Sequence, residues 1–177
     1  ESEARRFPEI MGGGVALLDL ENDGDLDLYL VQSGTLEATS AASPGNALHE
    51  NALYENDGGA RFTDRSAGSG AADRGYGMGV AAGDMDQDGL TDLYVTNLGP
   101  NALLRNRGAG RFEDLTARAQ VGDPAWSTSA AFLDLDADGD LDLFVCNYVK
   151  WSAEHDVFCS LDGKQKSYCT REAYRGD

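Results

Sequence analysis

The chain has few basic residues, and this shortage excludes two large classes of partner. Only 14 lysines and arginines stand against 31 aspartates and glutamates, so the formal net charge is −17 over 177 residues. Nucleic acids and anionic membranes repel a surface of this sign, and we expect neither as a partner. No apolar run in the sequence is long enough to form a membrane span.

The sequence also lacks a recognisable catalytic constellation. Acid–base or nucleophilic catalysis needs a base, a nucleophile or an open metal position. The chain has only two histidines, His49 and His155, and neither stands in a motif with a serine or cysteine. We therefore expect no enzymatic activity and place both histidines in surface loops.

The residues that are plentiful indicate a folded chain of many short strands. Hydrophobic residues make up 41% of the sequence, aromatic residues only 8%, and there are 22 glycines. This composition favours short strands joined by tight turns over disorder. The length suits one domain or one array of repeats.

An acidic pattern of nine residues occurs three times. It reads DLENDGDLD at 19–27, DMDQDGLTD at 84–92 and DLDADGDLD at 134–142. Carboxylates at such spacing repel one another and resist joint ionisation unless a cation neutralises them. The glycine at position 6 permits a sharp bend, and a backbone carbonyl at position 7 completes a cage of oxygen ligands. Six or seven oxygens favour calcium over magnesium, zinc or copper.

The sequence therefore predicts three calcium sites, with their ligands at positions 1, 3, 5, 7 and 9 of each loop. Leu90 at position 7 is expected to contribute only its carbonyl. The predicted ligands are Asp19, Glu21, Asp23, Asp25 and Asp27 in the first loop, Asp84, Asp86, Asp88, Leu90 and Asp92 in the second, and Asp134, Asp136, Asp138, Asp140 and Asp142 in the third.

Neither a plain hairpin turn nor an EF-hand fits the three loops as well as a calcium loop between two strands. A single Asp-Gly turn is common in ordinary hairpins, but three copies make coincidence improbable. An EF-hand requires glutamate at position 12, where the three loops have Leu30, Val95 and Val145. The residues after each loop, LDLYLV, TDLYVT and LDLFVC, are typical of strands rather than of an exiting helix.

The loops belong to a repeat of about 50 residues. Asn101 lies 50 residues after Asn51, and Asp134 lies 50 residues after Asp84. Each loop joins two apolar runs, and in the first two copies a second pair of runs follows, NALYENDGGARFTD and NALLRNRGAGRFEDLT. Four short strands in each repeat predict a blade of a β-propeller.

The phrases FPEIMGGGVALLDLENDGDLDLYLV, NALYENDGGARFTD and YGMGVAAGDMDQDG carry a family resemblance. The chain resembles the FG-GAP/VCBS repeat family, whose calcium-loop blades also build the head of integrin α-subunits. It is similar in particular to secreted proteins related to cartilage acidic protein. The resemblance implies extracellular propeller blades that calcium stabilises, with ligands at the loop positions named above, and it implies no known reaction.

The expected architecture is all-β: a partial β-propeller of four-stranded antiparallel blades, with the calcium loops in β-hairpins. The expected units are a lead-in strand at 1–10, a first blade at 11–66 with an inserted loop at 33–46, a second blade at 76–117, and a partial third blade with a cysteine-containing loop at 126–177.

The three cysteines bear on where in or outside the cell the protein is located. Cys159 and Cys169 lie in the polar segment FCSLDGKQKSYC, which suits a local disulfide, whereas Cys146 is expected to be a buried free thiol in a strand. A disulfide implies an oxidising compartment, and loops of this kind fill best at near-millimolar calcium. We expect a secreted protein, or one of the periplasm or cell surface. Zinc ligation by the cysteines is disfavoured because only His155 is near.

An array that ends in an incomplete blade has an open sheet edge, which is prone to association. The leading hypothesis is a homo-oligomer or filament in which copies pack head to tail. The alternative is part of a larger propeller that binds extracellular proteins or glycans, with Trp126, Trp151 and Tyr76 as a stacking platform. The tripeptide RGD at 175–177 matches an integrin-recognition motif, but three residues recur by chance.

Overall fold

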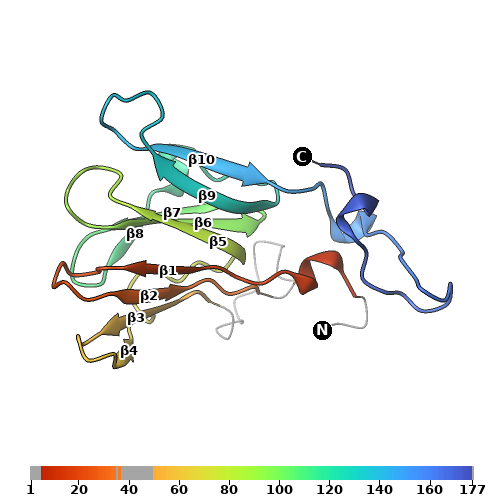
Figure 1. Cartoon of the computed structure of the whole chain (residues 1–177), viewed down its shortest axis with the longest axis horizontal. Helices are drawn as coiled ribbons and strands as arrows, with labels where there is room; N and C mark the ends of the chain where they lie inside the picture. Colours follow the sequence, from red (N-terminus) through yellow and green to blue (C-terminus); the bar gives the residue numbers. More distant parts are fainter. Residues whose placement is uncertain (1–4, 35, 37–49, 177) are drawn as a thin grey trace.

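Three antiparallel sheets stand side by side in the computed structural model, which describes residues 5–34, 36 and 50–176 (Figure 1). Blade 1 contains β1 (Val15–Leu18), β2 (Asp27–Leu30), β3 (Ala52–Asn56) and β4 (Phe62–Asp64). Blade 2 contains β5 (Tyr76–Gly83), β6 (Asp92–Leu98), β7 (Ala102–Asn106) and β8 (Phe112–Asp114). Blade 3 contains β9 (Ser127–Leu133) and β10 (Asp142–Asn147).

Each sheet is an antiparallel meander in which strands pair in chain order. The sheets contain four, four and two strands, which confirms the prediction of an all-β partial propeller. A short helix, α1 (Thr116–Ala119), follows β8. No helix among the described residues has the length and apolar character that crossing a membrane requires.

The first hairpin of every blade has the same register. The residue before each acidic loop pairs with position 9 of that loop: Leu18 with Asp27, Gly83 with Asp92, and Leu133 with Asp142. The aliphatic and aromatic residues that follow position 9 have high strand propensity, so they continue the ladder directly from the loop. The loop spacing thus sets the register of all three hairpins.

Glycines allow the inner strands of the blades to approach closely. A Cβ atom on Gly14 would lie 2.9 Å from the Cα of Gly79, and one on Gly79 would lie 2.6 Å from the carbonyl oxygen of Thr128. Neither approach leaves room for a side chain. Gly14 and Gly79 each stand five residues before position 1 of their loop, so the repeat places them at the same contact between blades.

A hydrophobic cluster fills the space between blades 1 and 2. Tyr29 and Leu53 from blade 1 and Leu93 from blade 2 are 0% exposed. The remaining buried members are Ala16, Leu18, Leu20, Val31, Ala71, Val95, Ala102, Leu104 and Phe112. Burial of these apolar side chains is the main force that holds the two blades together.

A buried tyrosine–asparagine pair recurs in both complete blades. The Asn51 side-chain amide donates to the Tyr29 hydroxyl at 3.0 Å, and the Asn101 amide donates to the Tyr94 hydroxyl at the same distance. Each tyrosine hydroxyl in turn donates to a backbone carbonyl. Asn51 Oδ1 accepts a backbone N–H from the segment after β2, and Asn101 Oδ1 accepts one from β6. Both networks satisfy polar groups that would be costly to bury alone.

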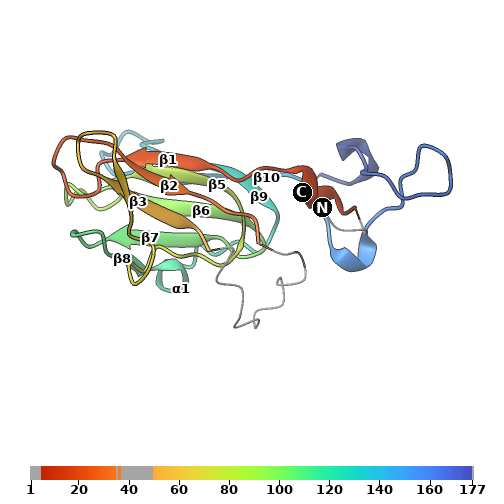
Figure 2. The ribbon, with the colours of Figure 1, turned by 90° about the horizontal axis from the view of Figure 1, so that it is seen from below.

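The segments near the two ends of the described chain lie beyond one end of the blades (Figure 2), where Phe7 and Tyr174 are in contact. The Phe7 ring stacks on Tyr174 with centroids 5.0 Å apart and makes an edge contact with Trp126. The prediction of a lead-in strand at 1–10 is wrong for its described C-terminal part, because Phe7–Ile10 forms a 3₁₀ helix, η1. Pro8 has no N–H for a strand ladder and stands in the first turn of this helix, where proline is favoured.

The C-terminal segment is irregular, with two short 3₁₀ helices, η3 (Ala153–His155) and η4 (Arg171–Ala173). A disulfide joins Cys159 to Cys169 across Cα atoms 5.2 Å apart. Cys146 is exposed, so the prediction of a buried thiol is wrong. The cause is its place on β10, an edge strand that no third strand covers among the described residues.

The aromatic residues proposed as a sugar platform do not form one. Trp126 and Tyr76 are only 2% and 7% exposed, and Trp151 packs edge-on against Trp126. Tyr76 and Trp126 are buried members of a hydrophobic cluster, and Trp151 packs against that cluster. Most of the predicted inserted loop at 33–46 lies outside the described residues, as does His49.

Candidate metal centre

The three acidic loops lie next to one another at one end of the blades (Figure 1). All three adopt the same backbone conformation. Position 4 is left-handed in each, with φ of 59° at Asn22, 58° at Gln87 and 62° at Ala137. The glycine at position 6 is also left-handed in each loop, with φ between 85° and 95°. At φ near 90° a glycine avoids the strain that a Cβ atom would add, which explains why the sequence repeats it at position 6.

The aspartate at position 1 closes each loop through two hydrogen bonds. In the second loop the Asp84 carboxylate accepts the N–H of Asp88 at 3.0 Å and of Gly89 at 2.9 Å. Asp19 and Asp134 make the corresponding contacts in the other two loops. These hydrogen bonds from backbone N–H groups to the position-1 carboxylate hold the shape of each loop.

The aspartate at position 9 anchors the loop to the blade. Asp27 and Asp92 are 0% exposed, and each carboxylate accepts one N–H from position 2 of its loop and one from the third strand. Asp142 accepts the N–H of Leu135 and no other donor among the described residues, and it is exposed. The structure therefore gives position 9 a structural role in blades 1 and 2.

Three carboxylates converge in the second loop and three in the third. One carboxylate oxygen of each of Asp84, Asp86 and Asp88 lies within 4.8 Å of the other two, and the same holds for the equivalent residues of the third loop, Asp134, Asp136 and Asp138. These are positions 1, 3 and 5, as the spacing predicts. An all-oxygen set of this charge fits a hard divalent cation such as calcium.

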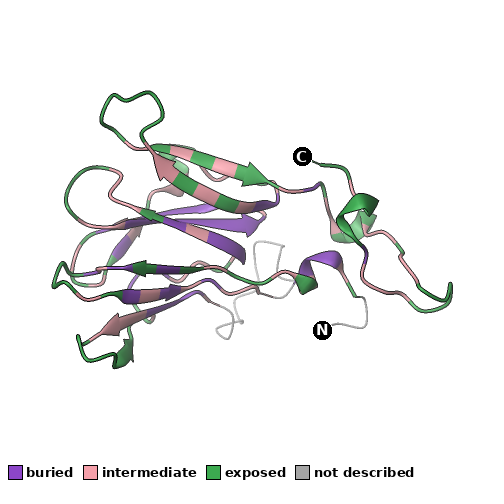
Figure 3. Ribbon diagram, viewed as in Figure 1, coloured by how far each residue is buried: buried purple, intermediate pink, exposed green. Residues whose placement is uncertain are grey.

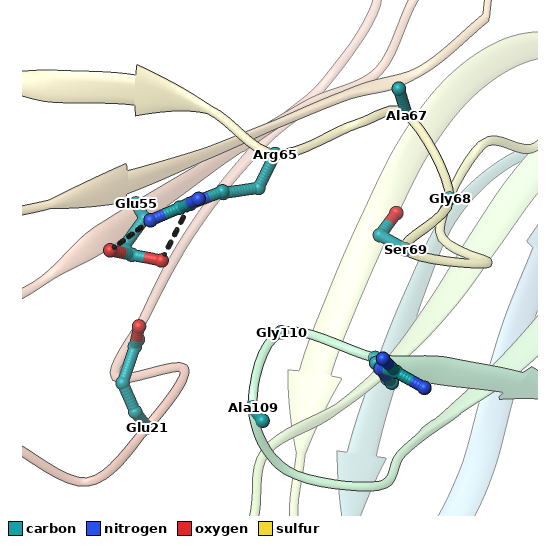
Figure 4. A pocket seen from close by; sticks show the side chains of 9 residues that line it. Glu21, Glu55, Arg65, Ala67, Gly68, Ser69, Ala109 and Gly110 are labelled. Atoms are coloured by element: carbon teal, nitrogen blue, oxygen red, sulfur yellow. Dashed lines mark hydrogen bonds and ion pairs between the residues drawn. The ribbon is translucent and has the colours of Figure 1, made fainter.

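In the first loop the position-3 side chain turns away from positions 1 and 5. The Glu21 carboxyl lies beside the carboxyl of Glu55 of β3, and Glu55 accepts a bidentate hydrogen bond from Arg65 (Figure 4). Burial, and next the negative charges of Asp27 and Glu55, raise the pKa of Glu21 to about 7. The same residues line a polar cavity of about 480 Å³ between the outer parts of blades 1 and 2.

One feature of the first loop does favour a bound cation. Asp25 Oδ1 is inaccessible to solvent and has no hydrogen-bond partner among the described residues. Burial and the charge of Asp23 raise the pKa of Asp25 above its usual range. A carboxylate oxygen without a donor is stabilised by a bound cation, so Asp25 remains a predicted ligand at position 7.

Arg105 of β7 lies against the carboxylates of the second loop. Its Nη2 is 2.5 Å from Asp86 and 3.1 Å from Asp88. These contacts, the hydrogen bond to Asp88 first among them, raise the pKa of the guanidinium further. The equivalent residue of blade 1 is Glu55, 50 residues earlier, which carries the opposite charge. The second loop thus has a built-in cation that competes with a metal ion for two of its ligands.

We expect Arg105→Ala to tighten calcium binding at the second loop by about tenfold, because it removes a positive charge beside the ligands. The amide resonance of Gly89 in a calcium titration followed by nuclear magnetic resonance reports this loop separately from Gly139 in the third loop. Arg118→Ala removes the same charge from an exposed site in the same blade and is expected to change the affinity little. Weaker binding in Arg105→Ala would mean that the guanidinium orients the carboxylates.

Side chains at position 4 link neighbouring loops. Asn22 donates to the Gly89 carbonyl of the second loop at 2.6 Å. Gln87 donates to the Gly139 carbonyl of the third loop at 3.1 Å and to the Asp140 carboxylate at 2.7 Å. Ala137 ends this series because it has no donor. The three loops therefore form one connected row.

Sequence reasoning missed Arg105, Glu55 and the links from position 4. Glu55 and Arg105 come from third strands, and their approach to the loops follows from the fold of the blade rather than from the spacing of the loop residues. A signal for the links was present in the amide side chains at position 4 of the first two loops.

The comparisons agree with the repeat seen in the structure. A family model described as an FG-GAP-like repeat matches residues 19–95 and 84–145, which together cover more than half of the chain. The two matches begin at Asp19 and Asp84, the first positions of the first two loops. No curated protein sequence matches the chain.

Proposed function

The chain belongs to the FG-GAP-like repeat family, and we propose that it is a calcium-stabilised propeller module that acts by binding. Calcium serves as a structural cofactor in the three loops, and the module catalyses no reaction. The observation that carries the proposal is the convergence of three carboxylates at the same positions of two consecutive blades.

Calcium would be held by the carboxylates at positions 1, 3 and 5 of the second and third loops, with the carbonyl of Leu90 or a carboxylate at position 7 nearby. In the first loop, Asp19, Asp23 and Asp25 are the corresponding ligands, and Glu21 must turn from Glu55 to join them. A bound ion contributes charge neutralisation, which offsets the repulsion within each loop. The row of links through Asn22 and Gln87 joins each site to the next blade.

The proposed location is outside the cytoplasm: secreted, in a periplasm or on a cell surface. Two observations support it. The Cys159–Cys169 disulfide is of a kind that persists in oxidising compartments. Exposed loops with open geometry are filled at near-millimolar calcium, which is an extracellular concentration range.

The proposed activity is association with further copies of the chain, head to tail, through the unpaired sheet edges. β4, an outer strand of blade 1, is exposed at all three residues, and β10 is half-covered or exposed throughout. Unpaired strand edges template pairing with another chain. A contact between two different edges propagates into a filament when it does not close into a ring.

Light scattering with electron microscopy, in millimolar calcium and again after chelation, tests this function. Regular polymers or oligomers that form in calcium and dissociate on chelation are the expected result. A monomer under both conditions would overturn self-association and support the alternative, an array of blades within a larger propeller that binds other extracellular proteins or glycans.

A further inference from the structure

We propose that the amide side chain at position 4 of each of the first two loops helps to build the calcium site of the next blade. Asn22 and Gln87 are then positioning residues, because each one holds the backbone that leads into the position-7 ligand of the neighbouring loop. This inference rests on the proposed function, since it concerns how the loops hold calcium. It goes further by making two of the three sites depend on a residue from a different blade.

The two amides reach the same peptide group in their neighbouring loops. Asn22 donates to the Gly89 carbonyl at 2.6 Å, and Gln87 donates to the Gly139 carbonyl at 3.1 Å. Both glycines occupy position 6, so each contacted carbonyl belongs to the peptide group that leads into position 7. The contact recurs between two pairs of loops, and it therefore follows from the arrangement of the blades.

That peptide group is held from both sides. The N–H of Leu90 donates to the Asp88 carboxylate at 3.0 Å, and the N–H of Asp140 donates to the Asp138 carboxylate at 2.9 Å. These bonds come from position 5 of the same loop, whereas the bond to the carbonyl comes from the preceding blade. A planar peptide group that is hydrogen-bonded at both its N–H and its C=O has little freedom to rotate. Holding it limits the directions in which the position-7 ligand can point.

In the third loop the amide also contacts the side chain at position 7. Gln87 Nε2 donates to Oδ1 of Asp140 at 2.7 Å. This bond uses one carboxylate oxygen and leaves the other, together with the backbone carbonyl, for a cation. Asp25 has the same position in the first loop, and its Oδ1 has no partner among the described residues. The amide from the preceding blade thus satisfies an acceptor that is unpaired where the amide is missing.

Alanine at position 4 is compatible with the loop itself, which makes the contact testable. Ala137 occupies position 4 of the third loop with φ of 62°, close to the 59° of Asn22 and the 58° of Gln87. The third loop keeps the two hydrogen bonds to its position-1 carboxylate, Asp134. Both amides lie on the exposed surface of the loops (Figure 3), so alanine leaves no cavity. Replacing either amide therefore removes the link and preserves the shape of its own loop.

The test is a calcium titration of the chelator-treated chain in which the amide resonances of Gly24, Gly89 and Gly139 report the three loops separately. Gln87→Ala is expected to raise the midpoint calcium concentration for Gly139 about fivefold, because the third loop loses two exposed hydrogen bonds. The midpoint for Gly89, in the substituted loop itself, should stay within about twofold, because a surface substitution that removes no ligand has a small effect. Circular dichroism of each variant verifies that the blades remain folded.

Asn22→Ala provides the corresponding test at the preceding pair of loops. Its expected effect is a higher midpoint for Gly89 and an unchanged midpoint for Gly24. An effect that falls in the next blade distinguishes positioning from a general structural role, which would weaken calcium binding in the substituted loop. Asn22→Gln should keep the affinity of the unsubstituted chain, because glutamine makes the same contact from position 4 of the second loop.

Gln120→Ala is the matched control for Gln87→Ala. Gln120 is an exposed glutamine of the same blade, and its backbone is left-handed in the same way, with φ of 59°. It follows α1 and lies outside the acidic loops. All three midpoints should stay unchanged in this variant.

Two results would overturn the positioning role. One is the same midpoint for Gly139 in Gln87→Ala and in the unsubstituted chain. The other is a shift for Gly89 as large as that for Gly139, which would mean that the substitution disturbs its own loop. In both cases the unsubstituted chain still binds calcium, and the proposed function stands. If no resonance of the unsubstituted chain responds to calcium, the proposed function fails together with this inference.

Discussion

Asp92→Ala is expected to lower the free energy of unfolding by about 2–5 kcal/mol, because each buried N–H donor left without a partner costs roughly 1–3 kcal/mol. The Asp92 carboxylate is 0% exposed and accepts the N–H groups of Met85 and Asn106. Alanine would leave both donors unpaired and separate the loop from β7. Burial is the largest influence on the pKa of Asp92 and raises it, although both hydrogen bonds act in the opposite direction.

The matched control is Asp142→Ala, at the same position of blade 3. Asp142 is exposed and, within the part of the chain that the structure describes, accepts the N–H of Leu135 alone, so its loss should cost a small fraction of the effect at Asp92. Urea unfolding of both variants in chelator isolates the hydrogen-bond role from any role in metal binding. If the two substitutions destabilise the chain equally, the buried Asp92 carboxylate does not stabilise the fold by anchoring the third strand.

Calcium is expected to raise the melting temperature by about 5–10 °C for each filled loop, when its concentration exceeds the dissociation constant about a hundredfold. The ion binds the folded loops and has no comparable site in the unfolded chain. The double substitution Asp136→Ala with Asp138→Ala should remove the third loop's share of this stabilisation. Differential scanning calorimetry with and without calcium measures it.

Magnesium and a second variant provide the controls for this prediction. Magnesium should stabilise less, because it requires a near-ideal octahedral site and loses its hydration water reluctantly. Asp162→Ala with Glu172→Ala removes two acidic charges from the C-terminal segment and should keep the calcium response. A melting temperature that is the same in calcium and in chelator would contradict a stabilising role for the ion.

The sequence alone was sufficient to predict the repeat, the hairpin that each loop closes, and the convergence of positions 1, 3 and 5 in the second and third loops. All three follow from spacing, since a fixed loop length and a glycine at position 6 determine the turn. The role of the position-9 aspartate was harder to predict from the sequence. Asp27 and Asp142 look alike in the sequence, and only the third strand makes one buried and the other exposed.

The errors have physical causes in long-range packing. Cys146 was expected to be buried because its strand is apolar, but β10 has no neighbour on its outer edge among the described strands. The segment RRFPEI at 5–10 resembles the fourth-strand phrase RFTD at 61–64, yet Phe7 packs against the ring of Tyr174 from the other end of the chain. Such a contact between distant segments leaves no local periodicity to detect.

The close approach of blades at Gly14 and Gly79 was detectable in principle. Both glycines stand at one fixed distance before their loops, and a recurring glycine within a strand indicates close approach of another backbone. The placement of Glu55 and Arg105 was not detectable in this way. Their opposite charges at equivalent positions distinguish the first two loops only once the third strand is seen to approach the loop.

The most direct test of whether the three acidic loops are calcium sites is a calcium titration that reports on each loop separately. The other proposals about this protein depend on that assignment. The amide resonances of Gly24, Gly89 and Gly139 report the three loops separately when calcium is titrated into the chelator-treated chain. We predict that all three shift and saturate by millimolar calcium, with Gly89 requiring more calcium than Gly139 because of Arg105. Resonances that stay unchanged at millimolar calcium would contradict the assignment of the loops as calcium sites.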